Sequence, residues 1–361
     1  MPKVEIVVIG ASAGGLEALL AIVERLSPSA PAVLIAMHTS STGTSHLPAI
    51  LGRATRLPVS TAKEGDRITP GRLLIAPPDF HMLVTRRGIS LTRGPRENGF
   101  RPAIDPLFRS AARIYTSRVM GVILSGALDD GSFGMKVIQQ HGGVTVVQDP
   151  DEAAIPSMPL SVLENITVDH VLNAAGIAHV IERGPAGHRT SEARMAQRKD
   201  PEPQDRGTPT EVEDMTATYG LASGLTCPDC GGALWEIADG APVRYRCHVG
   251  HQFSPGALES SQHDAVEAAL WTAVRALEEH SDMKQRMADR AREAGLEVVH
   301  HGFLAGAQDS HRQAQTIRDL LFDRRAVEPA GPVVAGATSP ARRVRSTPPR
   351  RPRKSRTRRV S

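Results

Sequence analysis

The sequence VEIVVIGASAGGLEALLAIVERL (residues 4–26) joins an aliphatic run to an amphipathic segment through a turn rich in glycine. The run VEIVVIG (4–10) lacks in–out alternation, which is typical of a strand covered on both faces. The segment LEALLAIVERL (16–26) has the apolar spacing of a helix. The order of strand, tight turn and helix predicts the first unit of a parallel, doubly wound α/β sheet.

The same alternation continues through the first half of the chain. Four more aliphatic runs each suit a buried strand: AVLIAMH (32–38), RLLIAPP (72–78), VMGVILSG (119–126) and VTVVQD (144–149). DPLFRSAARIY (105–115) predicts a helix, and MLVTRRGISLT (82–92) predicts a β-hairpin with its turn at Arg87-Gly88. We therefore expect residues 1–182 to form one α/β domain with a mostly parallel sheet and a hairpin.

The second half divides by composition. Residues 183–218 are polar and contain Pro and Gly, which predicts a disordered linker, and the cysteine cluster in 219–256 predicts a small module. Helical periodicity over 262–294 and 303–322 predicts an αα-hairpin within 257–325. The composition of residues 326–361 predicts a disordered basic tail. Because the linker is polar, we expect the two halves to work independently.

Charge and composition exclude several classes of protein. The net charge is +4, but residues 341–361 carry ten Lys/Arg and no acid, so the remaining 33 basic and 39 acidic residues have a net charge of −6. Aromatic residues make up only 3% of the chain, which disfavours single-strand nucleic-acid binding by base stacking. No apolar run approaches the ~18 residues of a membrane span. With three cysteines and no signal peptide, we expect a cytoplasmic protein without membrane insertion.

Ser12 is the best candidate nucleophile. It lies in the turn Gly10-Ala11-Ser12-Ala13-Gly14-Gly15, where the free N–H groups of a helix start favour a developing negative charge. A phosphate-binding loop and a plain helix N-cap remain open as alternatives. The spacing, however, is not G-x-G-x-x-G, and no G-K-[ST] follows.

His38 is the best candidate for a general base, because it ends the strand next to Ser12. His81 and His46 are rivals, and Asp79-x-His81 lies at another strand end. Ligands of an open parallel sheet bind at the carboxyl ends of its strands, where these side chains gather.

Asp129, Asp130 and Asp149 are the candidates for a carboxylate that orients the histidine. Asp130 precedes a glycine at a helix start, and Asp129 could merely cap that helix. The spacing does not separate them. With a serine and a histidine, any of the three would complete a Ser-His-Asp nucleophilic site.

Five motifs occur in order in this half: GASAGG (10–15), AMH (36–38), LLIAPPDFHM (73–82), FRPAIDPLF (100–108) and VILSGALDDG (122–131). Together they resemble the catalytic domain of the chemotaxis protein-glutamate methylesterase family (CheB). The resemblance implies an α/β enzyme that demethylates glutamyl methyl esters on chemoreceptors and often deamidates receptor glutamines.

By motif position, the resemblance implies that Ser12, His38 and Asp130 are the catalytic triad and that catalysis needs no cofactor. We also expect Arg101 to bind acidic receptor segments, with a structural ion pair as the alternative. The best-known members begin with a phosphorylated receiver domain. Because the first strand starts at residue 4, we expect a stand-alone form without one.

Cys227 and Cys230 are followed after sixteen residues by Cys247, His248 and His251. The spacing C-x2-C-x16-C-x3-H resembles the paired knuckles of a zinc ribbon. We expect Cys227, Cys230, Cys247 and His251 to hold a structural zinc, since adjacent Cys and His ligands would strain the site. A redox-active C-x-x-C is the competing interpretation.

A non-catalytic signalling adaptor on the same fold is the alternative function. It would assemble partners through the zinc module and the helical hairpin, whose apolar face suits a partner or a second copy. The module has few basic residues, so we expect nucleic acid to bind only nonspecifically, through the tail.

Overall fold

The structure is a computed structural model of the 361-residue chain, and it describes residues 3–39, 45–184, 220–237 and 243–326. The chain divides into two compact units, Met1–Ala268 and Ala269–Ser361. The predicted linker (183–218) and tail (326–361) lie almost wholly outside the described residues. None of the described helices is both long enough and apolar enough to cross a membrane.

A parallel sheet forms the centre of the first unit. Among the described residues it has seven strands in the order β3-β4-β2-β1-β7-β8-β9. The strands are β1 (Ile6–Ala11), β2 (Ala32–Met37), β3 (Val59–Thr61), β4 (Leu73–Ile75), β7 (Val119–Ile123), β8 (Val144–Gln148) and β9 (His170–Leu172). Because β1 pairs with both β2 and β7, its carboxyl end lies at the centre of one sheet edge.

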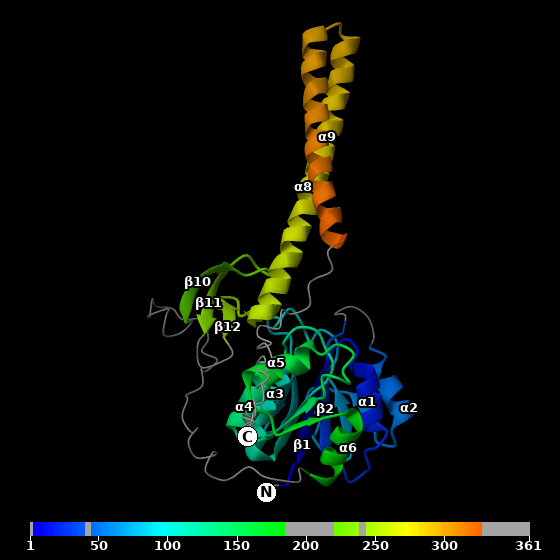
Figure 1. The fold of residues 1–361 in the computed structure, drawn as a ribbon, viewed down its shortest axis with the longest axis vertical. Coiled ribbons are helices and arrows are strands. Elements are labelled where there is room, and N and C mark those ends of the chain that lie inside the picture. The colour runs from blue at the N-terminus through cyan, green and yellow to red at the C-terminus, as the bar shows by residue number, and fades with distance from the viewer. Residues whose placement is uncertain (1–2, 40–44, 185–219, 238–242, 327–361) are drawn as a thin grey trace, which may run out of the picture. The chain divides into compact units, whose positions relative to one another are not determined.

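Helices cover both faces of this sheet (Figure 1). Val7 and Ile9 of β1 pack against one set of helices, while Ile6 and Val8 pack against the other. The first set is α1 (Gly15–Val23), α2 (Leu47–Ala54) and α6 (Ala174–Arg183), and the second is α3 (Ile104–Tyr115), α4 (Ser132–Gln140) and α5 (Ser157–Asn165). Burial on both faces explains why the strand sequences are continuously apolar, and the predicted doubly wound α/β fold is confirmed.

Two features of this unit differ from the sequence prediction or refine it. The hairpin forms as β5 (His81–Thr85) and β6 (Gly88–Thr92), and a short 3-10 helix, η1 (Thr116–Arg118), precedes β7. The strands β3 and β9 were not predicted. Each has three residues, none of them buried, and each lies at an edge of the sheet, so neither produces the long apolar run that marks the central strands.

A small antiparallel sheet follows in the same unit. Its strands are β10 (Leu221–Thr226), β11 (Ala233–Ile237), β12 (Arg244–Cys247) and β13 (Gln252–Phe253). We call residues 220–256 the metal module. Among the described residues, its apolar core consists of Leu234, Phe253 and two cysteines, together with Leu258 just beyond the module, and Tyr245 packs against them. So small a core contributes little free energy of folding.

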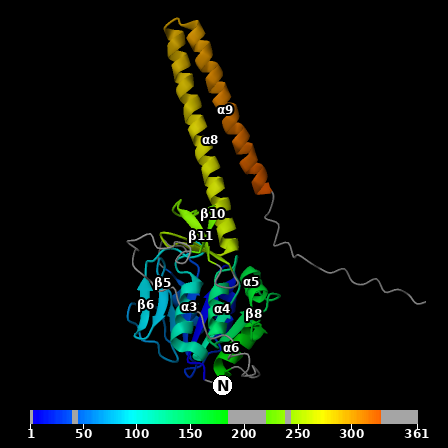
Figure 2. The ribbon, with the colours of Figure 1, turned by 90° about the vertical axis from the view of Figure 1, so that its left-hand side faces the viewer.

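Two long helices end the described chain, and Figure 2 shows them side by side as a hairpin. They are α8 (Pro255–Glu293) and α9 (Glu297–Ala326), longer than the predicted 262–294 and 303–322. The helix α8 begins earlier because Ser254 caps it through a hydrogen bond from the Ala257 N–H, and Pro255 occupies its first position. The partner-binding role predicted for this hairpin stays a prediction.

Candidate active site and metal cluster

The turn after β1 holds Ser12 in a fixed position. Its backbone N–H donates to the Ser125 carbonyl at 3.0 Å, which ties the turn to the loop after β7. Gly14 has a φ of 74°, and a Cβ there would lie 2.7 Å from Ala154 Cβ and 2.8 Å from Ser125 Oγ. The turn therefore requires glycine for both its conformation and its space. Ser12 is 8% exposed and lies in the turn that leads to the N-cap of helix α1, Gly14.

His38 follows β2 and contacts Ser12 directly. Its Nδ1 lies 3.1 Å from Ser12 Oγ, and its Nε2 lies 2.7 Å from Asp130 Oδ2. The imidazole also stacks on Phe100, with ring centroids 3.7 Å apart and an angle of 5° between the planes. The ring is thus fixed at both nitrogens and on one face.

Asp130 lies in the loop between β7 and α4 and is 1% exposed. Its Oδ2 also accepts from the Ile104 N–H at 2.7 Å, and its Oδ1 accepts from Asn98 Nδ2 at 2.8 Å and from the Asp105 N–H at 3.3 Å. Burial opposes ionisation of Asp130, but the hydrogen bonds from His38, Ile104 and Asn98 outweigh it and hold the pKa of this carboxyl below its usual range. The carboxylate is therefore ionised and fixed at both oxygens.

Asp105 is a second buried carboxyl beside Asp130. Burial, followed by repulsion from Asp130, raises the pKa of Asp105 to about 7. Its Oδ1 accepts from the Gly134 N–H at 2.6 Å. Arg109, which pairs with Glu97 through two contacts of 2.8 Å, opposes this increase in the pKa of Asp105, whereas Glu97 adds to it.

The structure separates His38 from the histidines that rivalled it in the sequence. His81 is 3% exposed, and its ring bonds the Pro95 carbonyl at 2.9 Å and the Ala103 N–H at 3.3 Å. His46 is exposed, at the N-terminus of α2. Among the described residues, His38 is the histidine that contacts both Ser12 and a buried carboxylate.

The rival aspartates lie elsewhere. Asp129 Oδ1 accepts at 2.5 Å from the hydroxyl of Ser254, the residue that caps α8, and the Asp129 carboxylate also accepts from the Gly256 N–H. Its side chain therefore does not cap α4. Asp149 accepts from the Asp151 N–H at 3.0 Å, within its own turn. The triad predicted from the resemblance, Ser12, His38 and Asp130, is thus the set that the structure brings together.

Arg101 forms an ion pair in the structure, which is the alternative to substrate binding that the sequence left open. Its Nε and Nη2 donate to Asp79 Oδ1 at 3.0 and 2.6 Å, and its Nη1 donates to the carbonyls of Arg93 and Gly94 at 3.1 and 2.8 Å. The hydrogen bond from Arg101 lowers the pKa of Asp79. Its predicted contact with an acidic substrate stays a prediction.

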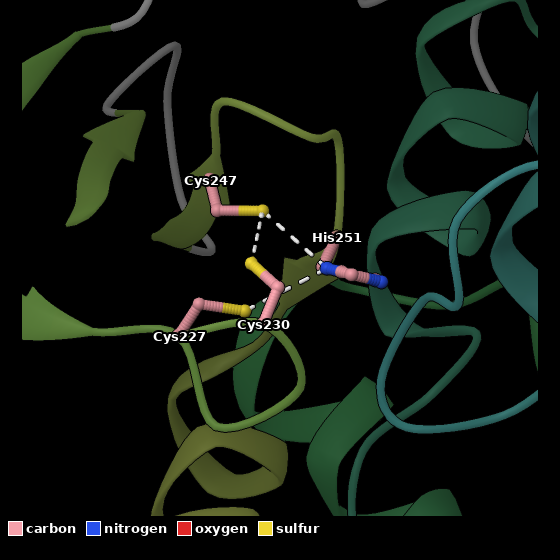
Figure 3. Close-up of side chains that lie close together, drawn as sticks. All are labelled: Cys227, Cys230, Cys247 and His251. Atoms are coloured by element: carbon pink, nitrogen blue, oxygen red, sulfur yellow. Dashed lines mark hydrogen bonds between the residues drawn. The ribbon is translucent and has the colours of Figure 1, made fainter. Parts of the chain in front are cut away.

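The predicted metal ligands converge in the metal module (Figure 3). One ligand atom from each of Cys227, Cys230, Cys247 and His251 lies within 4.8 Å of all the others. Cys230 Sγ lies 3.7 Å from Cys247 Sγ, and His251 Nδ1 lies 3.7 Å from Cys227 Sγ and 3.5 Å from Cys247 Sγ. A tetrahedral zinc with Zn–S bonds of ~2.3 Å would space its sulfurs by ~3.8 Å, so these side chains fit the ion.

Sequence reasoning missed several residues around the triad. The sequence assigns no role in the site to Phe100, Asn98 or Asp105. A signal did exist at Asn98, because Asn-Gly is a turn dipeptide and both Asn98 and Gly99 have positive φ, 53° and 80°. That signal predicts a turn, but it does not predict which carboxylate the amide would reach.

A serine bonded to an imidazole that is bonded to a buried carboxylate, at the carboxyl edge of a doubly wound sheet, is the arrangement of the α/β serine hydrolases. A family model described as CheB methylesterase matches residues 7–181. The chain belongs to the CheB methylesterase family and is a hydrolase of that family. The metal module lies outside the matched range.

Similar proteins and a similar structure cover the same half of the chain. A putative protein-glutamate methylesterase/protein-glutamine glutaminase of Leptospira interrogans is 37% identical over 181 residues, which are 50% of this chain and 94% of that protein. A protein-glutamate methylesterase/protein-glutamine glutaminase of Anaeromyxobacter dehalogenans is 40% identical over 47% of this chain and 50% of its own length. The crystal structure of the Thermotoga maritima CheB methylesterase catalytic domain aligns with a TM-score of 0.48 and 32% identity, over 50% of this chain and 97% of that one.

Proposed function

We propose that this chain hydrolyses glutamyl methyl esters on chemoreceptor-type proteins, with Ser12 as the nucleophile. The observation that carries the proposal is the Ser12–His38–Asp130 chain of contacts, 3.1 and 2.7 Å long, in a member of the CheB methylesterase family. The names of its relatives support glutamyl methyl esters, and the amide of glutamine, as substrates.

In the first half of the reaction, His38 acts as the base. With Nε2–H donating to Asp130, the free lone pair is on Nδ1, which faces Ser12 Oγ. Nδ1 takes the hydroxyl proton as Oγ attacks the γ-ester carbonyl carbon, and the electron pair of the carbonyl moves to its oxygen. His38 then gives this proton to the leaving methoxide, so methanol departs and a glutamyl ester of Ser12 remains.

In the second half of the reaction, water takes the place of the serine hydroxyl as the nucleophile. His38 removes a proton from water, the hydroxide attacks the acyl carbon, and Ser12 leaves with the proton that His38 returns. Asp130 holds the imidazole in one tautomer and stabilises its charged form. The backbone N–H groups near Ala13, at the start of α1, are the proposed donors to the oxyanion.

The same site would also account for deamidation of glutamine. A glutamine side chain gives the same glutamyl-enzyme, because only the leaving group changes from methanol to ammonia. His38 must then protonate a poorer leaving group, so deamidation would be the slower reaction of the two.

We further propose that the metal module holds one structural zinc through Cys227, Cys230, Cys247 and His251. Four protein ligands leave no position for substrate, so the ion would have no part in ester hydrolysis. The second ring nitrogen of His251 lies 3.8 Å from Asp229 Oδ2, on the side where a carboxylate commonly supports a metal-bound histidine.

Methanol release from methylated receptor fragments tests the function. Wild-type protein should release methanol, and folded Ser12→Ala and His38→Ala variants should be slower by about 10⁴-fold or more. Turnover by either folded variant near the wild-type rate would remove the triad assignment. A folded wild-type protein that releases no methanol or ammonia would favour the adaptor function instead.

A further inference from the structure

Asn98 lies between the triad and the metal module and bonds to both. It is 6% exposed, and its Nδ2 donates to Asp130 Oδ1 at 2.8 Å. At its other end, Oδ1 accepts from the Ser254 N–H at 2.8 Å, and the backbone N–H of Asn98 donates to the Gln252 carbonyl at 2.8 Å. One residue thus joins the catalytic carboxylate to the strand that follows His251.

The orientation of this amide is determined by its partners. Oδ1 faces a donor, the Ser254 N–H, and Nδ2 faces an ionised acceptor, Asp130. Rotation by 180° would place oxygen against carboxylate and NH₂ against N–H, which are both repulsive. The contact with residue 254 therefore keeps the donor directed at Asp130.

Other contacts join the same surfaces. The Gln252 N–H donates to the Arg96 carbonyl at 3.3 Å, so both the N–H and the carbonyl of Gln252 bond to the 96–98 segment. The guanidinium of Arg244 lies 3.6 Å from the ring centroid of Phe133, in the first turn of α4. Asp129, next to the catalytic aspartate, accepts from Ser254 Oγ.

The strand that makes these bonds belongs to the edge of a small sheet. β13 has two residues, pairs with β12, and follows directly after His251, and its Phe253 is buried in an apolar core of few side chains. Four ligands on one ion would fix residue 251, and with it the Gln252 carbonyl and the Ser254 N–H. Without the ion, those two backbone groups lose the framework that holds them against Asn98.

We propose that the metal module positions the catalytic carboxylate through Asn98, so that zinc bound by Cys227, Cys230, Cys247 and His251 raises the reactivity of Ser12. Asn98 touches no reacting atom and is a positioning residue. The inference rests on the proposed triad and zinc site, but not on the identity of the ester.

The experiment measures how fast a serine-directed fluorophosphonate labels Ser12 in full-length, zinc-loaded protein. Labelling needs an activated serine and no particular ester, and it is read by mass as Oγ bonds phosphorus and fluoride leaves. Asn98→Gly tolerates the positive φ and removes the amide. Cys230→Ser removes one metal ligand. Asn173→Gly is the matched control, because it removes another hydrogen-bonded Asn side chain, the N-cap of α6.

Each of Asn98→Gly and Cys230→Ser should slow labelling about tenfold, the effect expected from losing a hydrogen bond to a charged group. The double variant should be no slower than either single variant, because both changes act through one contact. Asn173→Gly should label at the wild-type rate. Ester hydrolysis by the slowed variants should show the loss in kcat, with KM unchanged.

Asn98→Asp keeps an acceptor for the Ser254 N–H, but it replaces the donor to Asp130 and Asp105 by a carboxyl oxygen that repels Asp130. It should retain zinc and still label slowly, a result that a purely structural role of Asn98 does not give. Either of two results would overturn the inference. The first is that Cys230→Ser labels at the wild-type rate. The second is that Cys230→Ser slows labelling a further tenfold when Asn98→Gly is already present. Intact labelling without methanol release would contradict the proposed substrate alone.

Discussion

At the scale of single residues, the two neighbouring carboxylates Asp129 and Asp130 have different surroundings. Asp130 bonds His38, while Asp129 bonds Ser254. We predict that Asp130→Asn severely lowers methanol release, because an amide nitrogen facing Nε2 favours the wrong tautomer. Asp129→Asn should be mild, since its amide oxygen still accepts from the Ser254 hydroxyl. Steady-state kinetics of both variants checks the ranking, and the opposite order would move the orienting role to Asp129.

Asp105 should make the stability of the fold depend on pH. Its pKa is about 7 in the folded chain and near 3.8 when unfolded, so the folded state binds more protons between these values. Stability contributed by the protonated carboxyl is present below pH ~4 and is lost as pH rises through 7. Asp105→Asn mimics the protonated form, so its melting temperature should exceed that of wild type increasingly as pH rises from 4 to 8. Parallel melting curves over this range would contradict the prediction.

At the scale of elements, the turn between β1 and α1 permits a controlled test. Gly14 and Gly65 have nearly equal φ, 74° and 76°, but a Cβ would meet Ala154 and Ser125 at Gly14 and nothing within 4 Å at Gly65. Gly65→Ala should cost only the conformational penalty, about 1 kcal/mol. Gly14→Ala should cost more and should also displace Ser12 and slow ester turnover. Denaturant unfolding and kinetics measure both effects, and equal losses in the two variants would show that space at the turn is unimportant.

The metal module should depend on its ion for folding. Elemental analysis of tag-free protein should find one zinc per chain, and chelation should remove the amide hydrogen-exchange protection of β10–β13. Absence of zinc, together with a reversible disulfide between Cys227 and Cys230, would favour the redox interpretation. The control is β1, whose protection should persist, because its core contains no metal ligand.

These elements also show how far the sequence predicts the fold and site. The central strands were predictable because burial on both faces leaves continuous apolar runs, and Ser12 and His38 because parallel strands end at one edge. Asp130 could not be separated from Asp129 by spacing, since the distinction depends on which side of a loop each carboxylate faces. Asn98 could not be found because its partners come from distant strands and loops.

At the scale of the whole molecule, the first compact unit includes both the family-matched domain and the metal module, since it extends from residue 1 to 268. The sequence suggested that the two halves work independently, because a polar linker separates them. The contacts of Asn98, Asp129 and Phe133 with residues 244–254 argue against that independence. A linker's composition describes the connection between two segments, but it does not describe the surfaces that they present to each other.

Asn98 and Ser254 are 156 residues apart in the chain. A ribosome therefore completes the serine, histidine and aspartate long before it synthesises the residue that orients the amide. On the proposed coupling, a chain still being synthesised, or one cleaved before residue 254, would carry a complete triad of low reactivity. Full hydrolytic power would arise only after the chain extends past residue 254 and its metal module holds the ion, so the order of synthesis would delay the activity.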